Sequence, residues 1–136
     1  MASYPISDID GLTAPAAAKL KSIGIRTTES LLEAARSVKG RKALAARTGL
    51  AEQQFLEWAN IANFMRIKGM GKGKTDLVRA AGVTTVRELT HRNPQKLAEM
   101  MRMANDMRKL VRQMPSEKSI EQLIAHARKL PLKITY

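Results

Sequence analysis

The chain has 136 residues, the size of one ordinary domain, and 44% of them are hydrophobic. It carries 24 Lys and Arg against 12 Asp and Glu, a formal net charge of +12, and it has no Cys. This composition excludes disulfide scaffolds, thiolate zinc sites and Cys nucleophiles, and no apolar run approaches the ~18 residues of a membrane span. The positive charge favours a polyanionic partner, most often nucleic acid, although a solvated basic surface gives the same composition.

The positive charge is unevenly distributed along the chain. Residues 1–66 contain nine Lys and Arg and six Asp and Glu, a net of +3, whereas residues 67–136 contain fifteen and six, a net of +9. This asymmetry favours a functional basic face in the C-terminal half. Residues 1–9 lack the basic start and apolar core of a secretory signal, so we expect a cytoplasmic protein, with association with the nucleoid as a further option.

Hydrophobic residues recur at helical spacing and strand patterns are nearly absent, which predicts an all-α fold. We expect about nine short helices in one compact helical domain over residues 1–136. Its expected parts are repeat 1 at about 6–50, repeat 2 at about 51–93, C-terminal helices at about 94–130 and a tail at 131–136. The predicted core stripes are Phe55, Trp58, Ala59, Ala62 and Met65, then Leu97, Met100, Met101, Ala104 and Met107, then Ile120, Leu123, Ile124, Ala127 and Leu130.

Capping residues mark several predicted helix ends. Thr85 with Glu88 matches a capping box, in which each side chain accepts a hydrogen bond from the other residue's backbone N–H. Asn93 and Ser116, each beside a proline, are the other predicted N-caps, and they begin helices at 94–114 and 117–130. The glycines expected to end helices are Gly24, Gly40, Gly49 and Gly82.

Two segments 58 residues apart share glycines and apolar positions in one register, without a gap. The first begins at Ile9 and reads IDGLTAPAAAKLKSIGIRTTESLL, and the second begins at Ile67 and reads IKGMGKGKTDLVRAAGVTTVRELT. The pairs are Ile9 and Ile67, Gly11 and Gly69, Leu12 and Met70, Leu20 and Val78, Gly24 and Gly82, Ile25 and Val83, Thr27 and Thr85, and Leu31 and Leu89. This regularity predicts two copies of one structural unit.

Each copy resembles the helix-hairpin-helix motif, an apolar-x-Gly-apolar-Gly hairpin followed by a helix with a small residue near its start. The hairpin is Ile67–Gly71 with Thr75 in the second copy, and Ile9–Thr13 with Ala17 in the first. The pair is similar to the SAM-like tandem helix-hairpin-helix domains of DNA-repair, junction-binding and topoisomerase proteins. Over nearly its whole length the chain also resembles an uncharacterised bacterial family of paired helix-hairpin-helix repeats, a domain of unknown function.

The resemblance implies two pseudo-symmetric helix-hairpin-helix units followed by a C-terminal helical extension. It also implies that the hairpin carbonyls can hold a monovalent cation, and we expect no other cofactor. Glycines allow positive φ, and a hairpin's amides together with the next helix's N-terminus suit a phosphate without reading sequence. The residues expected to bind it are Lys68, Gly69, Met70, Gly71, Lys72, Gly73, Lys74 and Arg79. The same hairpin can also serve only as a compact helix connector or a protein contact.

The first copy departs from this pattern. Asp10 stands where the second copy has Lys68, and Thr13 replaces the second hairpin glycine. We expect Thr13 to cap the following helix, with Pro15 in its first turn, and this copy to be mainly structural. Its weaker second site consists of Gly11, Thr13, Lys19 and Lys21.

The predicted helix at 94–114 offers a basic extension of the site. Its cations Arg102, Arg108, Lys109 and Arg112 are expected largely opposite the apolar stripe, and a solvated helix face explains them equally well. The methionines from Met100 to Met114 are expected to pack in an adaptable core, with a Met-rich partner groove as the alternative.

Catalysis is not expected. The run GMGKGKT at 69–75 lacks the Gly that a P-loop needs at position 68, and a predicted helix precedes it in place of a strand. His91 and His126 are far apart and have no Cys partner, so a surface or capping role is expected rather than a metal site. No Asp/Glu cluster points to two-metal nuclease chemistry. We therefore expect sequence-independent binding to DNA, duplex or branched, with RNA binding and a protein-interaction adaptor as alternatives.

Overall fold

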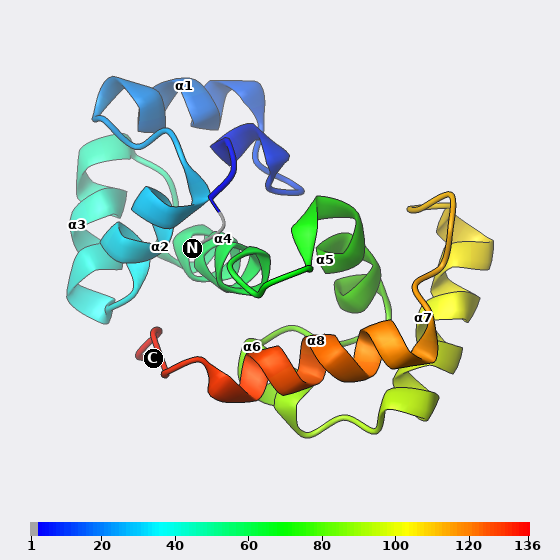
Figure 1. The fold of residues 1–136 in the computed structure, drawn as a ribbon. Helices are drawn as coiled ribbons and strands as arrows, with labels where there is room; N and C mark the ends of the chain where they lie inside the picture. The colour runs from blue at the N-terminus through cyan, green and yellow to red at the C-terminus, as the bar shows by residue number, and fades with distance from the viewer. Residues whose placement is uncertain (1–2) are drawn as a thin grey trace. The chain divides into compact units, whose positions relative to one another are not determined.

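The computed structural model describes residues 3–136, and in these residues the fold is all-helical, as predicted (Figure 1). Apart from one isolated bridge between Pro5 and Thr27, the described residues form no β-structure. The elements in chain order are the 3₁₀ helix η1 (Ile6–Asp8) and the α-helices α1 (Ala14–Ser22), α2 (Thr28–Ala35), α3 (Val38–Thr48), α4 (Glu52–Met65), α5 (Gly71–Ala80), α6 (Val86–Thr90), α7 (Pro94–Arg108) and α8 (Glu117–Lys129).

The helices fall into two compact units. The first unit takes the described residues up to Arg66 together with Leu132–Tyr136, and the second takes Ile67–Pro131. The second unit is therefore inserted into the sequence of the first. The predicted second repeat begins near residue 51, whereas the units divide after α4, so α4 belongs to the first unit. One compact domain over both units stays a prediction.

The core of the first unit is built around α4, which packs against α2 and α3. The residues predicted to form its apolar stripe, from Phe55 to Met65, are all buried. Phe55 and Trp58 contact each other edge to face, with ring centroids 5.4 Å apart. Because such a pair adds about 0.5–1.5 kcal/mol beyond the area it buries, Trp58 is a core anchor, as its spacing predicts.

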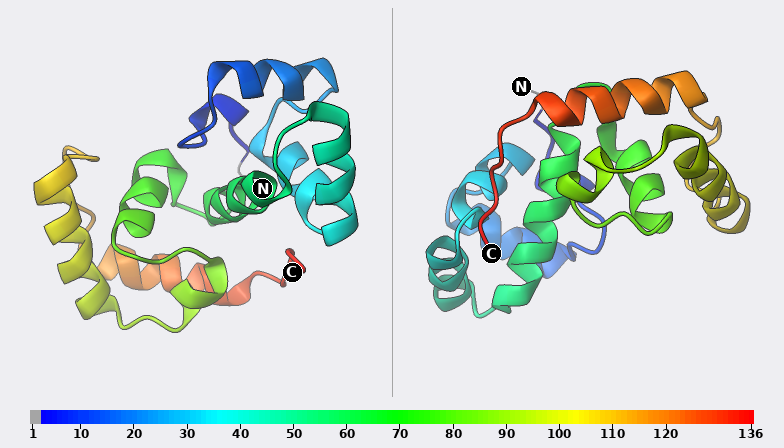
Figure 2. Two further views of the ribbon diagram at one scale, coloured as in Figure 1. Left: turned by 180° about the vertical axis from the view of Figure 1, so that it is seen from behind. Right: turned by 90° about the horizontal axis from the view of Figure 1, so that it is seen from below.

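The C-terminal tail packs on the first unit, where the red end of the chain reaches α2 and α3 (Figure 2). The backbone N–H of Thr135 donates to the carbonyl of Arg36 at 2.8 Å. The guanidinium of Arg41, which is 3% exposed, donates to the carbonyl of Thr135 at 2.6 Å. Lys133 lies 2.9 Å from Glu33, and this hydrogen bond lowers the pKa of the Glu33 carboxyl from its ordinary value.

In the second unit, α8 packs against α6 and α7. The predicted stripe of α8 from Ile120 to Ala127 is buried, while Leu130 is half-buried. The guanidinium Nε of Arg128 donates to the carbonyl of Thr90 at 3.0 Å, which ties the last turn of α8 to the end of α6. The helix α8 is thus anchored at both its apolar face and its C-terminal end.

Most of the predicted helix ends are confirmed. Asn93 and Ser116 cap α7 and α8, because their side chains accept hydrogen bonds from backbone N–H groups in the first turns. Gly49 ends α3 with a positive φ. Gly40 does not end a helix, contrary to the prediction, because it lies in the first turn of α3 and donates its N–H to the N-cap Ser37. A Cβ at Gly40 would clash with the carbonyl of Ala34.

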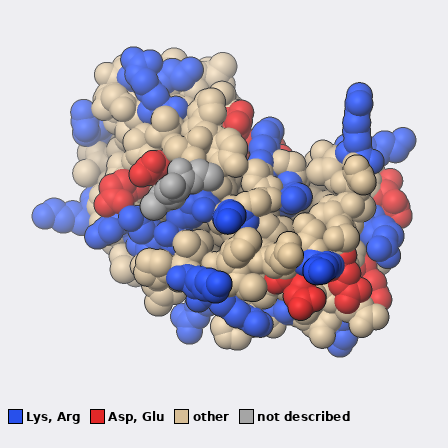
Figure 3. Space-filling view, viewed as in Figure 1, with Lys and Arg blue, Asp and Glu red and all other residues tan. Residues whose placement is uncertain are grey.

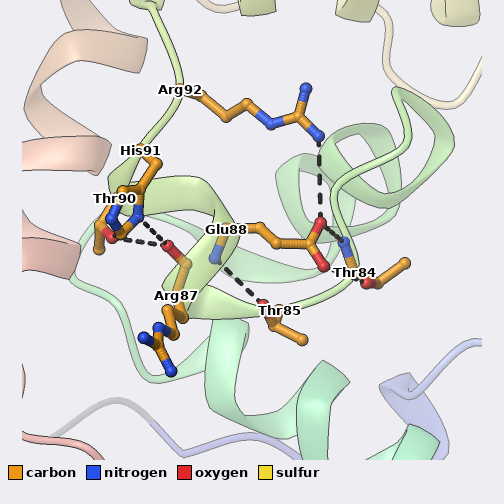
Figure 4. A network of polar contacts seen from close by, with 7 residues as sticks. All are labelled: Thr84, Thr85, Arg87, Glu88, Thr90, His91 and Arg92. Carbon is orange, nitrogen blue, oxygen red and sulfur yellow. Dashed lines mark hydrogen bonds and ion pairs between the residues drawn. The ribbon is translucent and has the colours of Figure 1, made fainter.

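The capping box predicted at α6 is half correct (Figure 4). The hydroxyl of Thr85 accepts a hydrogen bond from the backbone N–H of Glu88 at 3.1 Å, as predicted. The Glu88 carboxylate accepts from the hydroxyl of Thr84 at 2.8 Å and from its backbone N–H at 3.3 Å, and it lies 3.9 Å from Arg92. Glu88 therefore caps Thr84, one residue before the expected partner.

The helix predicted at 94–114 is shorter, because α7 ends at Arg108. Lys109 follows in the left-handed conformation with φ +51, and it is the only residue other than glycine with positive φ in the described chain. The amide side chain of Asn105 then holds Val111, accepting from its N–H at 3.0 Å and donating to its carbonyl at 3.1 Å. The residues after Arg108 therefore form a loop fixed to the last turns of α7.

The predicted methionine core of α7 is largely wrong. Leu97, Ala98 and Met101 are buried, but Met100, Met103 and Met107 are 42%, 67% and 86% exposed. The buried face therefore runs through Ala98 and Met101 rather than through Met100 and Met107. Three methionines at i, i+3 and i+7 form an exposed apolar face of α7, which we call the methionine face.

Candidate functional site

The second hairpin, residues 67–71, is fixed by two buried anchors. Ile67 and Met70 are 0% and 2% exposed, and the N–H of Met70 donates to the carbonyl of Ile67 at 3.0 Å. Gly69 and Gly71 adopt φ of +84° and +66°, a backbone that side chains rarely allow. Lys68 and Gly69 are exposed at the tip, so the hairpin presents its backbone to solvent.

The first hairpin, residues 9–13, has the same backbone arrangement at matched positions. The N–H of Leu12 donates to the carbonyl of Ile9 at 3.2 Å, and Gly11 has φ +82°. The match continues after the following helices, where the N–H groups of Ile25 and Val83 bond the carbonyls of Leu20 and Val78 at 2.9 and 3.3 Å. Gly24 and Gly82 have positive φ there too, +88° and +98°.

The helices that follow the two hairpins begin differently. The Thr13 hydroxyl accepts from the N–H of Ala16 at 3.3 Å and Pro15 lies in the first turn, so α1 is capped as predicted. The N-cap of α5 is Met70, and within the described part of the chain no side chain caps the N–H groups of the first turn of α5. An uncapped helix start carries unpaired N–H groups and a positive dipole end, so α5 offers an anion site that α1 has closed.

The lysines of the second hairpin have different partners. The Lys72 ammonium lies 2.9 Å from the Asp76 carboxylate, and the Lys74 ammonium donates to the carbonyl of Gly69 at 3.0 Å. The Lys68 side chain is exposed and makes no ion pair or hydrogen bond within residues 3–136. Arg79 lies in the last turn of α5, about 12 Å along the helix axis from the hairpin. Three of the four predicted cations therefore surround the start of α5.

Asp76 places a carboxylate beside these lysines. Its side chain is 15% exposed, and the oxygen not paired with Lys72, Oδ1, is buried without a hydrogen-bond partner. A buried acceptor without a donor destabilises the folded state, so the negative charge at this position has a structural cost. It also reduces the positive charge available to an anion at the start of α5.

The hairpin carbonyls are occupied by donors from the protein. Besides the bonds from Met70 and Lys74, the carbonyl of Lys68 lies 3.1 Å from Nδ1 of His126, and that of Gly71 accepts from the Thr75 hydroxyl at 2.6 Å. Ion selectivity for a monovalent cation requires several carbonyls that replace its hydration shell. These residues therefore do not fit the cation that the resemblance implies, because an ammonium already lies at the Gly69 carbonyl.

The histidines contact main-chain carbonyls, as a capping role requires. His126 of α8 reaches the hairpin at Lys68, and Nδ1 of His91 lies 2.9 Å from the carbonyl of Arg87 at the end of α6. Sequence reasoning did not connect His126 with the hairpin, because no local pattern links residues on α8 with residue 68. Among the described residues, no group of three His, Asp or Glu side chains is placed to hold a metal ion.

The loop after α7 lies against the start of α5. A Cβ added at Gly73 would lie 3.1 Å from the Val111 side chain, which is closer than an ordinary van der Waals contact. Any residue other than glycine would therefore force Val111 to shift. Lys109 and Arg112 flank Val111 in this loop and are exposed. They are not on a helix face, contrary to the prediction, because α7 ends before them. The predicted basic extension is therefore divided between two elements. Arg102 and Arg108 lie on α7, and Lys109 and Arg112 lie in the loop that follows it.

The predicted weaker site at the first hairpin is dispersed. Gly11 lies in the hairpin and Thr13 caps α1, but Lys19 and Lys21 lie in the last turn of that helix. Since the helix dipole is negative at its C-terminal end, these two lysines stabilise α1 where they are. They bring no cation to the first hairpin.

On the face shown in Figure 3, charged side chains do not mark one site. Blue Lys and Arg side chains are scattered over the face shown in Figure 3, with red carboxylates among them. No helix in the described part of the chain has the length and apolarity to cross a membrane. The local arrangement at the start of α5 therefore carries more information than the net charge.

A protein-family model described as "Domain of unknown function (DUF4332)" matches residues 10–130. The match includes the glycines of both hairpins and extends through α8. Comparison with curated proteins and with solved structures gave no significant match.

Proposed function

The chain belongs to this family of unknown function, and we propose that it binds the phosphate backbone of nucleic acid, with DNA, duplex or branched, as the preferred partner. The observation that carries the proposal is the uncapped start of α5, directly after a hairpin with two positive-φ glycines. The matched backbone bonds at 9–13 and 67–71 support two pseudo-symmetric helix-hairpin-helix units.

The proposed contact uses backbone amides first and side chains second. N–H groups of the first turn of α5 donate to phosphate oxygens, and the helix dipole adds attraction for the negative charge. Lys68, whose ammonium has no partner among residues 3–136, pairs with the same or the next phosphate. Because these groups reach no base edge, binding is independent of sequence.

The loop that follows α7 extends this contact. Val111 lies against Gly73 at the start of α5, and the exposed Lys109 and Arg112 belong to the same loop. Arg108 and Arg102 precede them on α7. A nucleic-acid strand held by the hairpin then meets further cations along its backbone, and a total of about three to five phosphates gives a slope of log K against log salt of about −3 to −4.5.

The test is a titration of duplex and branched DNA at two salt concentrations. The wild type is compared with Lys68→Glu/Lys72→Glu, and the matched control is Lys19→Glu/Lys21→Glu at the end of α1. The first double variant should lose most of its affinity and reduce the salt slope by about 1, since the Lys68 contact contributes about 0.9 while Lys72 is paired with Asp76 in the wild type. The control should leave affinity and slope nearly unchanged.

Equal binding by both double variants would contradict the proposal for the second hairpin. Binding of single-stranded or duplex RNA with no affinity for DNA would transfer the proposal to RNA, because backbone contacts alone suit either polymer. No catalytic step is part of the proposal.

The methionine face favours a second candidate function, a protein-interaction adaptor. Met100, Met103 and Met107 form an exposed, adaptable apolar surface, and Lys96 and Arg108 lie beside it in the sequence of α7. This exposed apolar surface suits the apolar face of an amphipathic helix from a partner protein. A Met103→Glu/Met107→Glu variant that loses a purified partner but keeps DNA affinity would favour the adaptor.

A further inference from the structure

The second hairpin carries a cation of its own. The ammonium of Lys74, in the first turn of α5, lies 3.0 Å from the carbonyl oxygen of Gly69 at the hairpin tip. The bond joins the two sides of the turn that exposes the phosphate-binding amides. A hydrogen bond from a charged donor is about twice as strong as a neutral one, so this contact favours one orientation of the Gly69 peptide.

The neighbouring carbonyls are oriented by other protein donors. The N–H of Met70, the imidazole of His126 and the hydroxyl of Thr75 lie within hydrogen-bonding distance of the carbonyls of residues 67, 68 and 71. A set of carbonyls directed at one point would attract a monovalent ion, but here a protein donor lies at each of these oxygens. Of the four protein donors at these hairpin carbonyls, Lys74, His126, Thr75 and the N–H of Met70, only Lys74 carries a permanent positive charge.

The first hairpin supplies an internal comparison. Ala16 stands 58 residues before Lys74, so the first hairpin has no ammonium at the matched position. It is also the hairpin whose helix start is closed by Thr13. The open anion site and the internal ammonium therefore occur in the same copy.

We infer that Lys74 serves as the built-in cation of the second hairpin, so that this hairpin keeps its binding conformation without a bound monovalent ion. Lys74 is then a positioning residue that acts on phosphate through the Gly69 carbonyl, and the direct contacts belong to the amides and to Lys68. The inference deepens the proposed function, since it concerns the same site.

The test follows the backbone amide resonances of residues 69–73 during a titration with KCl, with choline chloride as the ionic-strength control and no nucleic acid present. The wild type should show no saturable shift specific to K⁺. Lys74→Met, which keeps the aliphatic stem and removes the charge, should show one, because K⁺ enters at the vacated carbonyl. Lys74→Arg should behave as the wild type.

A saturable K⁺ shift in the wild type, or none in Lys74→Met, would overturn the inference. If Lys74→Met loses its helical circular dichroism, Lys74→Gln takes its place with the same two outcomes. In a second arm, DNA affinity is compared in KCl and in tetramethylammonium chloride, and only the Lys74 variant should bind more tightly in KCl. A wild type that binds no DNA removes the proposed function, while the amide titration still decides the role of Lys74.

Discussion

The two hairpins share a backbone and differ in what surrounds it. Gly11 and Gly69 have φ of +82° and +84°, and the same turn hydrogen bond follows each of them. In the first hairpin the Thr13 hydroxyl closes the next helix, whereas in the second the helix starts uncapped with lysines beside it. Glycine and apolar spacing thus determines the turn, whereas the residues around the helix start determine whether its first N–H groups are capped.

The largest effect on stability is expected from Asn105→Ala, which tests whether the second hairpin depends on the loop that covers its helix. The variant loses both hydrogen bonds to Val111, about 2 kcal/mol of unfolding free energy in total. Urea unfolding measures the loss, with the exposed neighbour substitution Asp106→Ala as control. DNA affinity should also fall, because Lys109 and Arg112 lose their fixed position. If Asn105→Ala lowers the stability but leaves DNA affinity unchanged, the loop after α7 does not contribute to DNA binding.

Gly69→Ala and Gly11→Ala place the same strain in each hairpin. A Cβ in the left-handed region costs about 1–2 kcal/mol, and a Cβ at either position has no neighbour closer than 3.7 Å. Both variants should therefore lose similar stability in thermal unfolding. Only Gly69→Ala should weaken DNA binding. Equal weakening by both would mean that the two hairpins contribute alike.

Thr13→Ala opens the first helix start. The loss of this N-cap is expected to lower the unfolding free energy by about 1 kcal/mol, measured by urea titration. DNA affinity should stay the same, because the two lysines of α1 lie in its last turn, away from the freed N–H groups. A gain in affinity would show that an open helix start is sufficient for phosphate binding.

The smallest change in stability is expected from Asp76→Asn, because an ion pair near the surface contributes less than about 1 kcal/mol. The substitution frees Lys72 and removes the carboxylate beside the helix start. DNA affinity should rise and the salt slope should steepen by about 1. A fluorescence titration at two salt concentrations measures both, and weaker binding would show that Asp76 supports the site.

The sequence was sufficient for the elements that depend on local chemistry. Asn93, Ser116 and Thr13 cap the helices they were expected to cap, because an N-cap needs only a short polar side chain and the next turn. Trp58 and the stripe of α4 are buried as their spacing predicts. The prediction of an all-α fold rests on the same kind of short-range regularity.

The remaining features depend on contacts between distant residues. The helix α7 ends at Arg108 because Lys109 adopts the left-handed conformation and Asn105 holds the backbone of Val111. Neither residue is a usual signal for the end of a helix. The exposed methionines share helical spacing with a core stripe, so periodicity alone does not tell which side faces the interior. The approach of His126 to the hairpin joins residues 58 apart in the chain.

The tail on the first unit has a consequence for how the protein is made. Residues 132–136 supply the carbonyl that the buried Arg41 bonds, and they follow the whole second unit in the sequence. On the ribosome, the second unit can therefore complete its folding before the first, even though the first is begun earlier. Until residues 132–136 are translated, the guanidinium of Arg41 lacks the bond to the carbonyl of Thr135 that it has in the folded structure.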